Sequence, residues 1–302
     1  MNDSALPADD EFRFLAGDAE RVGRAAPLPV VERVRASVGE GRVVSGLRFG
    51  APADPEVVAL HGAGLNAHSF DPMLLALGAP ALALDLPGHG RSDWRDDADY
   101  RPQRLAPDVT VAIERCSHRP VALLGHSLGG LTAALVAASR PALVGRLVVV
   151  DITPGVSPSG DAGAVAEFIT GQRHYATVDE IVDRAIRFGI GSDRAALTRG
   201  VSLNTRRRPD GRIEWTHHLA HLDALPAGGG GARPYAEIWD ALQSLEIPVS
   251  LIRADSGMLN DALVEEWRRR LPRAEVITLA GPHNLHEAAP TALAEAVRRS
   301  SR

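Results

Sequence analysis

Lysine is absent from this chain of 302 residues, so all 33 basic residues are arginines. Enzymes that form a Schiff base with their substrate, and phosphate-binding loops of the Walker A type, need a lysine amine. The sequence therefore excludes both classes. Acidic residues number 38, which gives a net charge of −5 at pH 7. A chain of this charge repels phosphate backbones, so we do not expect it to bind nucleic acid.

Cysteine and long apolar runs are also scarce. Cys116 is the only cysteine, so the chain can form neither an internal disulfide nor a cysteine metal site. The longest apolar stretches, such as residues 131–138, are much shorter than the ~20 residues that a membrane span needs. The N-terminal segment is acidic, unlike a basic and apolar export leader. We therefore expect a cytoplasmic protein with no membrane span.

Short apolar runs alternate along the chain with segments of helical length. Continuous apolar runs are typical of strands that are buried on both faces, and they occupy residues 56–60, 80–84, 120–124, 146–150 and 248–252. Two alternating strands are expected before them, at 31–38 and 42–49, and one after them, at 274–279. Helices are expected at residues 8–24, 66–77, 102–116, 128–140, 259–271 and 290–298. This order predicts an α/β fold with a mostly parallel sheet covered by helices on both faces.

One interval breaks this alternation. About 90 residues separate the last two of the buried runs, and they predict helices at 162–171, 178–190 and 194–205 without a buried strand. We therefore expect a core of residues 1–154 and 246–302, interrupted by a mainly helical cap at 155–245. Within the cap, residues 228–231 are four glycines, which predict a surface loop.

Residues 125–129 read GHSLG and carry the strongest chemical signal. They follow a predicted strand and open a predicted helix, which is the context of a nucleophile elbow. Small residues on either side allow a sharp turn that pushes the serine out at the edge of the sheet, beside a helix N-terminus that favours an oxyanion. We predict that Ser127 is a nucleophile. The alternative is a serine that only caps the helix.

A serine hydroxyl needs a base to take its proton, and the base needs a third group to orient it. His283 lies directly after the last predicted strand and is the favoured base, with His286 as the alternative. Asp151 follows the strand after the nucleophile strand, and Asp255 follows the next one. Either carboxylate can point at the histidine from there, and we favour Asp151.

Residues 61–64 read HGAG after a predicted strand. Small residues there let backbone amides turn inward, so the N–H groups of Ala63 and Leu128 are the predicted oxyanion hole. A rival interpretation exists, because residues 62–67 also match the G-x-G-x-x-A pattern of dinucleotide-binding folds, with Asp85 placed like a ribose-binding acid. That interpretation leaves the serine motif unexplained, and we give it less weight.

Three histidines in the predicted cap, His217, His218 and His221, include a pair spaced four residues apart. Such a pair can grip a metal, but the carboxylate of an H-E-x-x-H motif is missing. We therefore expect these side chains to pack in the cap, and we expect the protein to use neither a metal nor a cofactor.

These motifs resemble, in order and spacing, the α/β-hydrolase superfamily over essentially the whole chain. The segments that carry the resemblance are residues 61–64, 85–92, 125–129 and 280–286. Residues 27–34, 66–71, 99–102 and 147–154 are similar to actinobacterial, mycobacterial-type carboxylesterases of this superfamily. The resemblance implies an eight-stranded sheet with a cap, Ser127 as nucleophile and His283 as base. A serine, Ser256, stands where the family often carries its acid, and this departure favours Asp151.

The sequence thus predicts a serine hydrolase that cleaves small carboxylic esters with water through an acyl-enzyme. Three cap aromatics, Phe168, Phe188 and Trp215, are possible pocket residues, which suggests short or medium acyl chains. A lactonase or a carbon–carbon bond hydrolase would use the same triad, and a ligand-sensing protein would keep the fold without turnover. The sequence does not predict the oligomeric state.

Overall fold

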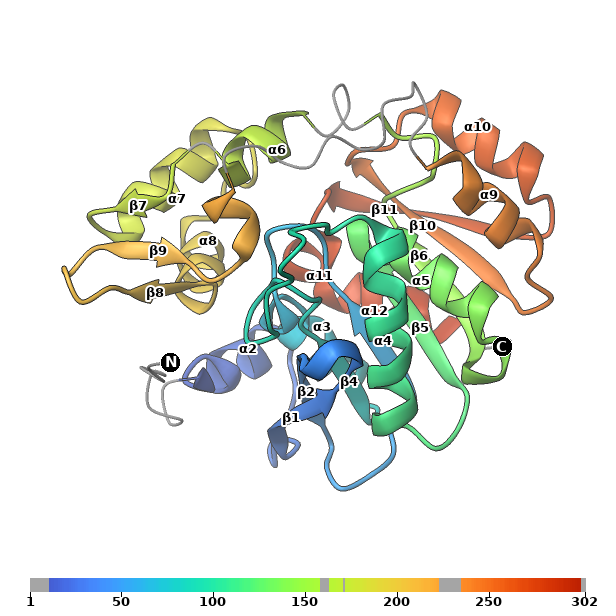
Figure 1. Cartoon of the computed structure of the whole chain (residues 1–302), viewed down its shortest axis with the longest axis horizontal. Coiled ribbons are helices and arrows are strands. Elements are labelled where there is room, and N and C mark those ends of the chain that lie inside the picture. Colours follow the sequence, from blue (N-terminus) through green and yellow to red (C-terminus); the bar gives the residue numbers. More distant parts are fainter. Residues whose placement is uncertain (1–10, 158–162, 171, 223–234, 300–302) are drawn as a thin grey trace.

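The computed structural model describes residues 11–157, 163–170, 172–222 and 235–299. Its centre is an eight-stranded sheet in the order β1-β2-β4-β3-β5-β6-β10-β11 (Figure 1). The strands are β1 (Val31–Ser37), β2 (Val43–Phe49), β3 (Val57–Leu60), β4 (Ala81–Leu84), β5 (Val121–His126), β6 (Val144–Val150), β10 (Val249–Ser256) and β11 (Glu275–Pro282). β2 pairs antiparallel with β1 and β4, and the other pairs are parallel. The predicted mostly parallel, eight-stranded sheet is confirmed.

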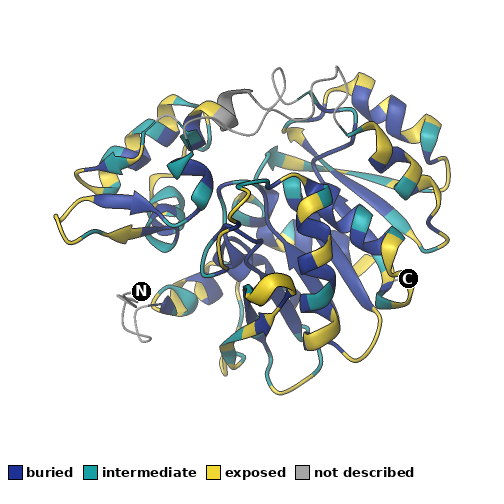
Figure 2. Cartoon of the chain, viewed as in Figure 1, coloured by how far each residue is buried: buried dark blue, intermediate teal, exposed yellow. Residues whose placement is uncertain are grey.

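Helices cover both faces of the sheet, which explains the continuous apolar strands. One face carries α4 (Pro102–Cys116), α5 (Leu128–Ser139), α9 (Ala236–Gln243) and α10 (Asp261–Arg270). The other carries α2 (Leu15–Arg21), α3 (Asp71–Leu77), α11 (Leu285–Ala288) and α12 (Pro290–Arg299). Successive residues of β3 join opposite cores: Val58 packs on the first face and Val57 on the second. Figure 2 shows the central strands as buried and the outer helix surfaces as exposed. No described helix has the length and apolarity to cross a membrane.

Local signals fix several helix ends. α4 begins at Pro102, whose fixed φ suits a first helical position. α3 ends at Gly78, which has the left-handed φ of +71° that glycine adopts without strain. Thr177 and Asn260 cap the N-termini of α7 (Val178–Arg187) and α10, because their side-chain oxygens accept hydrogen bonds from the amides of Glu180 and Leu263.

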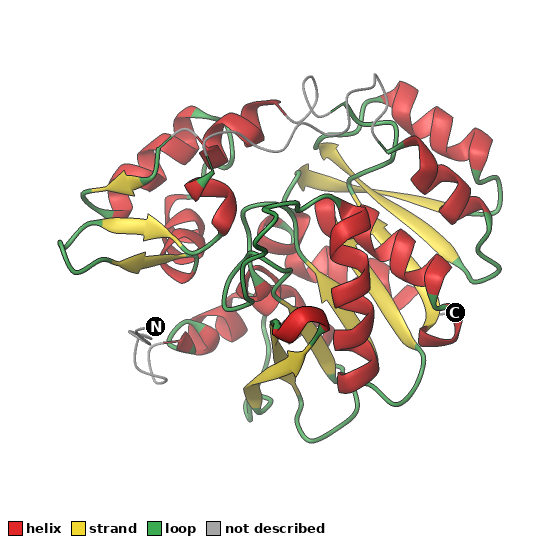
Figure 3. Ribbon diagram, in the orientation of Figure 1, coloured by secondary structure: helices red, strands yellow, loops and turns green. Residues whose placement is uncertain are grey.

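The described residues 163–170 and 172–222 lie between β6 and β10 and fold beside the carboxyl end of the sheet (Figure 1); we call this part of the chain the inserted segment. It contains α6 (Gly163–Thr170), α7 and α8 (Arg194–Leu203), and also a small antiparallel sheet in the order β7-β9-β8. These strands, β7 (His174–Tyr175), β9 (Ile213–Trp215) and β8 (Thr205–Arg207), are seen on the left of Figure 3. The sequence does not predict these strands, because strands of two or three residues leave no periodic pattern.

The predicted cap boundaries stay a prediction. α9 lies within the predicted range 155–245, yet it packs on the core helix α5, and its Trp239 lies against Trp267 of α10 with ring centroids 5.9 Å apart. The four glycines at 228–231, predicted as a surface loop, lie outside the described residues.

Candidate active site

Ser127 stands at the sharp turn from β5 into α5. Its φ of 53° and ψ of −122° are unusual for a residue with a side chain, and such a conformation costs about 1–3 kcal/mol. A Cβ atom at Gly125 would lie 2.4 Å from the carbonyl oxygen of Gly129, and one at Gly129 would lie 2.2 Å from that of Leu60. Glycine on both sides is therefore a steric requirement of the turn. Ser127 is partly exposed, so its side chain is not sealed inside the core.

The structure brings Asp151 and His283 together. The Nδ1 atom of His283 lies 2.8 Å from Oδ2 of Asp151, which is fully buried, whereas 20% of the His283 side chain is exposed. Asp151 also accepts hydrogen bonds from the amides of Ala254 (3.0 Å) and Met258 (2.7 Å). An ionised carboxylate only accepts, so Nδ1 of His283 carries the proton and donates it. The opposite ring nitrogen, Nε2, is then left with a lone pair, as a general base requires.

Contacts along the edge of the sheet bring this pair to the serine turn. The amide of Ser127 donates to the carbonyl of Val150 (3.1 Å), the residue before Asp151. His126, the residue before Ser127, donates from Nε2 to the carbonyl of His283 (3.1 Å), and the two imidazole rings lie 4.4 Å apart. The turn that carries Ser127 and the Asp151–His283 pair, which are far apart in the sequence, thus lie next to each other at the carboxyl ends of β5, β6 and β11.

The two alternative residues lie differently. Asp255 is exposed, and its carboxylate accepts from the amide of Gly281 (3.0 Å) and the hydroxyl of Ser256 (3.1 Å). It therefore supports the loop that leads to His283. His286 is fully buried against Phe70 and His126, and burial lowers its pKa to about 3. Among the described residues, neither ring nitrogen of His286 has a hydrogen-bond partner.

The loop after β3 runs close to Ser127, because a Cβ atom at Gly62 would lie 3.1 Å from that of Ser127. His61 fixes this loop: its Nε2 accepts from the amide of Leu86 (2.9 Å), so its Nδ1 carries the proton and donates to the Gly62 carbonyl (2.8 Å). Burial lowers the pKa of His61 to about 4, which keeps the ring neutral.

The hydrogen bonds of His61 orient one of the two predicted oxyanion donors. The Gly62 carbonyl and the Ala63 amide belong to one trans peptide, so they point in opposite directions, and the amide is aimed away from His61. The second predicted donor, Leu128, is the first residue of α5, where an amide has no acceptor within the helix.

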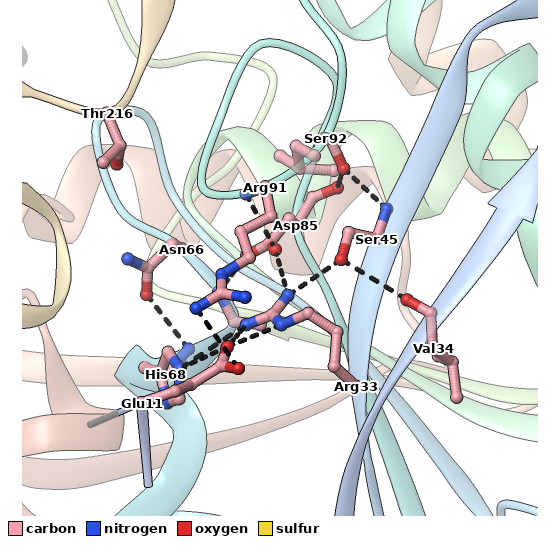
Figure 4. A network of polar contacts seen from close by, with 12 residues as sticks. Glu11, Arg33, Val34, Ser45, Asn66, His68, Asp85, Arg91, Ser92 and Thr216 are labelled. Carbon is pink, nitrogen blue, oxygen red and sulfur yellow. Dashed lines mark hydrogen bonds and ion pairs between the residues drawn. The ribbon is translucent and has the colours of Figure 1, made fainter. Parts of the chain in front are cut away.

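Asp85 ties the same loop to the turn after β4. Its carboxylate is fully buried and accepts from the amides of Ala67 (2.8 Å) and Arg91 (3.1 Å) and from the guanidinium of Arg33 (2.7 Å; Figure 4). Burial raises the pKa of a carboxyl group, but Arg33 and these amides outweigh that effect and hold the pKa of Asp85 below its usual value. Residues 85–92, which carry part of the family resemblance, thus begin with a carboxylate that holds the segment after the 61–64 loop in place.

A chain of buried charges continues from there into the inserted segment. His68 contacts Glu11 (3.2 Å; Figure 4) and Asp71 (2.8 Å). These carboxylates overcome the effect of burial and raise the pKa of His68 to about 8. Arg199 of α8 reaches across to bind Asp71 (3.0 Å) and Asp18 (Nε to Oδ2, 2.8 Å). This arginine, 7% exposed, joins the inserted segment to the core.

The cap histidines also bridge these two parts. The amide of His218 donates to the carbonyl of Gly88 (2.7 Å), and its ring contacts the hydroxyl of Tyr100 (2.6 Å). His217 is buried and its Nδ1 accepts from the amide of Ala220 (3.2 Å), while His221 contacts the carbonyl of Trp215 (3.0 Å). Over the part of the chain that the structure describes, no group of three or more His, Cys, Asp or Glu side chains is placed to hold a metal ion.

A cavity of about 320 Å³ lies between the inserted segment and the core. Its apolar walls come from the inserted segment, with Phe168, Ile190, Leu197, Val201 and Trp215. The core contributes Gly64 and Asn66 from the loop after β3, and Pro282 and Asn284 on either side of His283. Ser127 and His283 themselves are not among its lining residues, so the cavity lies beside the Asp151–His283 pair. Two of the three predicted pocket aromatics, Phe168 and Trp215, thus line the cavity. The third, Phe188, packs on Phe168 with ring centroids 5.9 Å apart.

The model of the alpha/beta hydrolase family matches residues 57–296, which include Ser127, Asp151 and His283. The chain belongs to the alpha/beta hydrolase family. Esterase Rv0045c from Mycobacterium tuberculosis is 37% identical to it, over 99% of this chain and 98% of the esterase. Membership in this family removes the dinucleotide-binding alternative for residues 62–67.

Solved structures agree with this assignment. A crystal structure of the same mycobacterial esterase superposes with a TM-score of 0.80 at 36% identity, over 98% of this chain and 99% of that one. A more distant relative, the sn-1-specific diacylglycerol lipase ABHD11 of Mus musculus, is 28% identical over 80% of each chain. The predicted family, fold and type of relative are therefore confirmed.

Proposed function

We propose that this protein hydrolyses carboxylic esters by a serine mechanism. The observation that carries the proposal is the hydrogen bond between buried Asp151 and His283 at the edge where the strained turn presents Ser127. The family and the 37% identity to a mycobacterial esterase support the same reaction.

In the proposed reaction, the Ser127 oxygen attacks the acyl carbon while Nε2 of His283 takes the hydroxyl proton. Asp151 holds the imidazole in the required tautomer and stabilises its positive charge. The carbonyl oxygen becomes an oxyanion that the amides of Ala63 and Leu128 stabilise. His283 then gives its proton to the leaving alcohol, and a water molecule, deprotonated in turn by His283, releases the acid and restores Ser127.

The substrate is proposed to be a small ester with a short or medium acyl chain. A volume of about 320 Å³ lies at the low end of ~300–1,000 Å³ for small-molecule pockets. The inserted segment contributes apolar side chains to its lining, Phe168 and Trp215 among them, beside polar ones such as Asp193 and Arg199. A lactone or a cleavable carbon–carbon bond would use the same groups, and a ligand sensor would bind without turnover. Location in the cytoplasm stays a prediction, as does the absence of a cofactor.

A panel of p-nitrophenyl esters tests the proposal. We expect turnover that is fastest for acyl chains of about two to eight carbons, because the cavity is small. Ser127→Ala should lower kcat by at least about 10³-fold, since loss of a catalytic serine costs up to ~10⁶. Ser139→Ala, an exposed serine at the end of the same helix, is the matched control and should keep wild-type turnover. Unchanged turnover in Ser127→Ala would contradict the proposal.

A further inference from the structure

The inserted segment contacts the loop that carries the proposed oxyanion donor. Asn204, the residue after α8, donates a hydrogen bond from its side-chain nitrogen to the carbonyl of Gly64, the neighbour of Ala63. Ile169 of α6 presses on the same residue, because a Cβ atom at Gly64 would lie 2.9 Å from Cγ1 of Ile169. Two separate elements of the inserted segment therefore hold this point of the loop.

Asn204 belongs to a pair of buried asparagines that join the two parts of the molecule; we call Asn66 and Asn204, each 5% exposed, the asparagine bridge. The nitrogen of Asn66 donates to the side-chain oxygen of Asn204 (3.2 Å) and to the carbonyl of Leu203 (2.8 Å). The oxygen of Asn66 accepts from the amide of His68 (3.0 Å; Figure 4).

The orientation of both amides follows from their backbone partners. The carbonyls of Gly64 and Leu203 can only accept, so each must face an amide nitrogen, and the amide of His68 can only donate, so it must face an oxygen. The side-chain oxygen of Asn204 accepts from Asn66 (3.2 Å) and shares the single hydroxyl proton of Thr216 with the backbone carbonyl of Asn204 (3.2 and 3.1 Å). Every contact of the bridge thus pairs a donor with an acceptor.

The residues on either side of Ala63, Gly62 and Gly64, each have their carbonyl held by a side chain, one from the core and one from the inserted segment. His61 of the core holds the Gly62 carbonyl, and Asn204 of the inserted segment holds the Gly64 carbonyl. We propose that Asn204 is a positioning residue for the oxyanion hole, so that the Ala63 amide is aimed correctly only while the inserted segment is docked on the core. This inference rests on the proposed esterase function, and it links docking of the inserted segment to the rate of the acylation step.

Two substitutions test the inference. Asn204→Ala removes the donor, and Asn204→Asp keeps the shape but places an oxygen opposite the Gly64 carbonyl. Complete loss of an oxyanion donor costs ~10²–10³ in kcat, so a misaimed donor should lower kcat by roughly 10- to 100-fold. We expect KM to change by less than about threefold, because an oxyanion interaction acts mainly in the transition state.

Inhibitor binding distinguishes a misplaced oxyanion donor from a general loss of packing around the pocket. A trifluoromethyl ketone adds to the serine and forms a tetrahedral oxyanion, whereas the matching alcohol cannot add and only occupies the pocket. In both Asn204 variants, affinity for the trifluoromethyl ketone should fall by the same factor as kcat/KM, and affinity for the alcohol should not change. Thr177→Ala, which removes the cap of α7 in the inserted segment, is the control for reduced stability and should keep wild-type kcat.

The possible results are distinct. Parallel loss of kcat/KM and ketone affinity in the Asn204 variants, with Thr177→Ala unaffected at a temperature where all variants are folded, supports the inference. Wild-type kcat and ketone affinity in both Asn204 variants would overturn it, and so would an equal loss in Thr177→Ala. A wild-type protein that cleaves no ester would overturn the proposed function itself, which is a different outcome from active wild-type protein with unaffected variants.

Discussion

Replacing Asp151 by asparagine places an amide where three hydrogen-bond donors converge. The carboxylate accepts from the amides of Ala254 and Met258 and from Nδ1 of His283. Asparagine has one oxygen and one NH₂ group, so at least one donor must face the NH₂. The position is fully buried, and water cannot take over the missing acceptor.

The size of the effect follows from the two orientations that the new amide can adopt. If its nitrogen takes the place of Oδ2, His283 must accept at Nδ1, and its proton moves to Nε2, where the base is needed. If its nitrogen faces Ala254 instead, the tautomer is correct, but the imidazolium loses its negative partner. A substitution of this kind in a serine triad lowers kcat by ~10⁴, so we expect a loss of about 10³–10⁴, or about 4–5.5 kcal/mol of transition-state stabilisation.

The N–H group that is left without an acceptor in Asp151→Asn should also lower the free energy of unfolding by about 1–3 kcal/mol. Initial rates with p-nitrophenyl butyrate measure the loss of kcat, and urea unfolding measures the loss of stability. Asp255→Asn is the matched control, because the exposed carboxylate of Asp255 bonds only to loop groups that an amide oxygen can still serve. The reasoning is refuted if Asp151→Asn keeps more than a tenth of kcat, or if Asp255→Asn loses as much.

Three further predictions concern stability, each measured by urea unfolding. Gly125→Ala should lower the free energy of unfolding by about 3 kcal/mol, because the new Cβ would lie 2.4 Å from a carbonyl oxygen. Gly145→Ala is the control and should change it by no more than about 0.5 kcal/mol, because its Cβ would have its nearest neighbour at 3.7 Å. Equal effects of the two substitutions would contradict this prediction. Arg199→Met should cost about 3–5 kcal/mol, because it removes the guanidinium from buried Asp18 and leaves buried Asp71 with His68 alone; a cost below about 1 kcal/mol would argue against a stabilising role for Arg199. The pKa of His68 in the folded protein, about 8, exceeds the ordinary histidine value of 6.5, so its stabilisation is complete below pH 6.5 and is lost as the pH rises through 8. That loss, about 2 kcal/mol, should disappear in His68→Gln, and an unchanged pH dependence in the variant would count against it.

The core could be predicted because its strands are buried on both faces. Each continuous apolar run predicted a strand within a few residues of its observed bounds, as for β3 and β4. The small sheet of the inserted segment could not be predicted, since its strands are short and β8 carries exposed arginines. α9 was missed because it lies next to the glycine-rich stretch, although its buried face packs on α5 as a core helix does.

The residues of the candidate site also differ in how well the sequence predicts them. The turn at Ser127 could be predicted because its steric demands act on neighbouring residues, and glycine is needed at 125 and 129. Asp151 and His283 could be proposed because the ends of parallel strands meet at one edge, although the choice over Asp255 and His286 needed the geometry. The asparagine bridge left no sequence signal, since its members are separated by 138 residues and come together only when the inserted segment docks.

Labelling with a fluorophosphonate, followed by peptide mass spectrometry, tests the central claim most directly. The reagent bonds covalently only to a serine oxygen that a base activates. The account predicts one adduct per chain, located on Ser127, and no adduct in Ser127→Ala. An adduct on another serine, or ester hydrolysis by protein that the reagent leaves unlabelled, would contradict it.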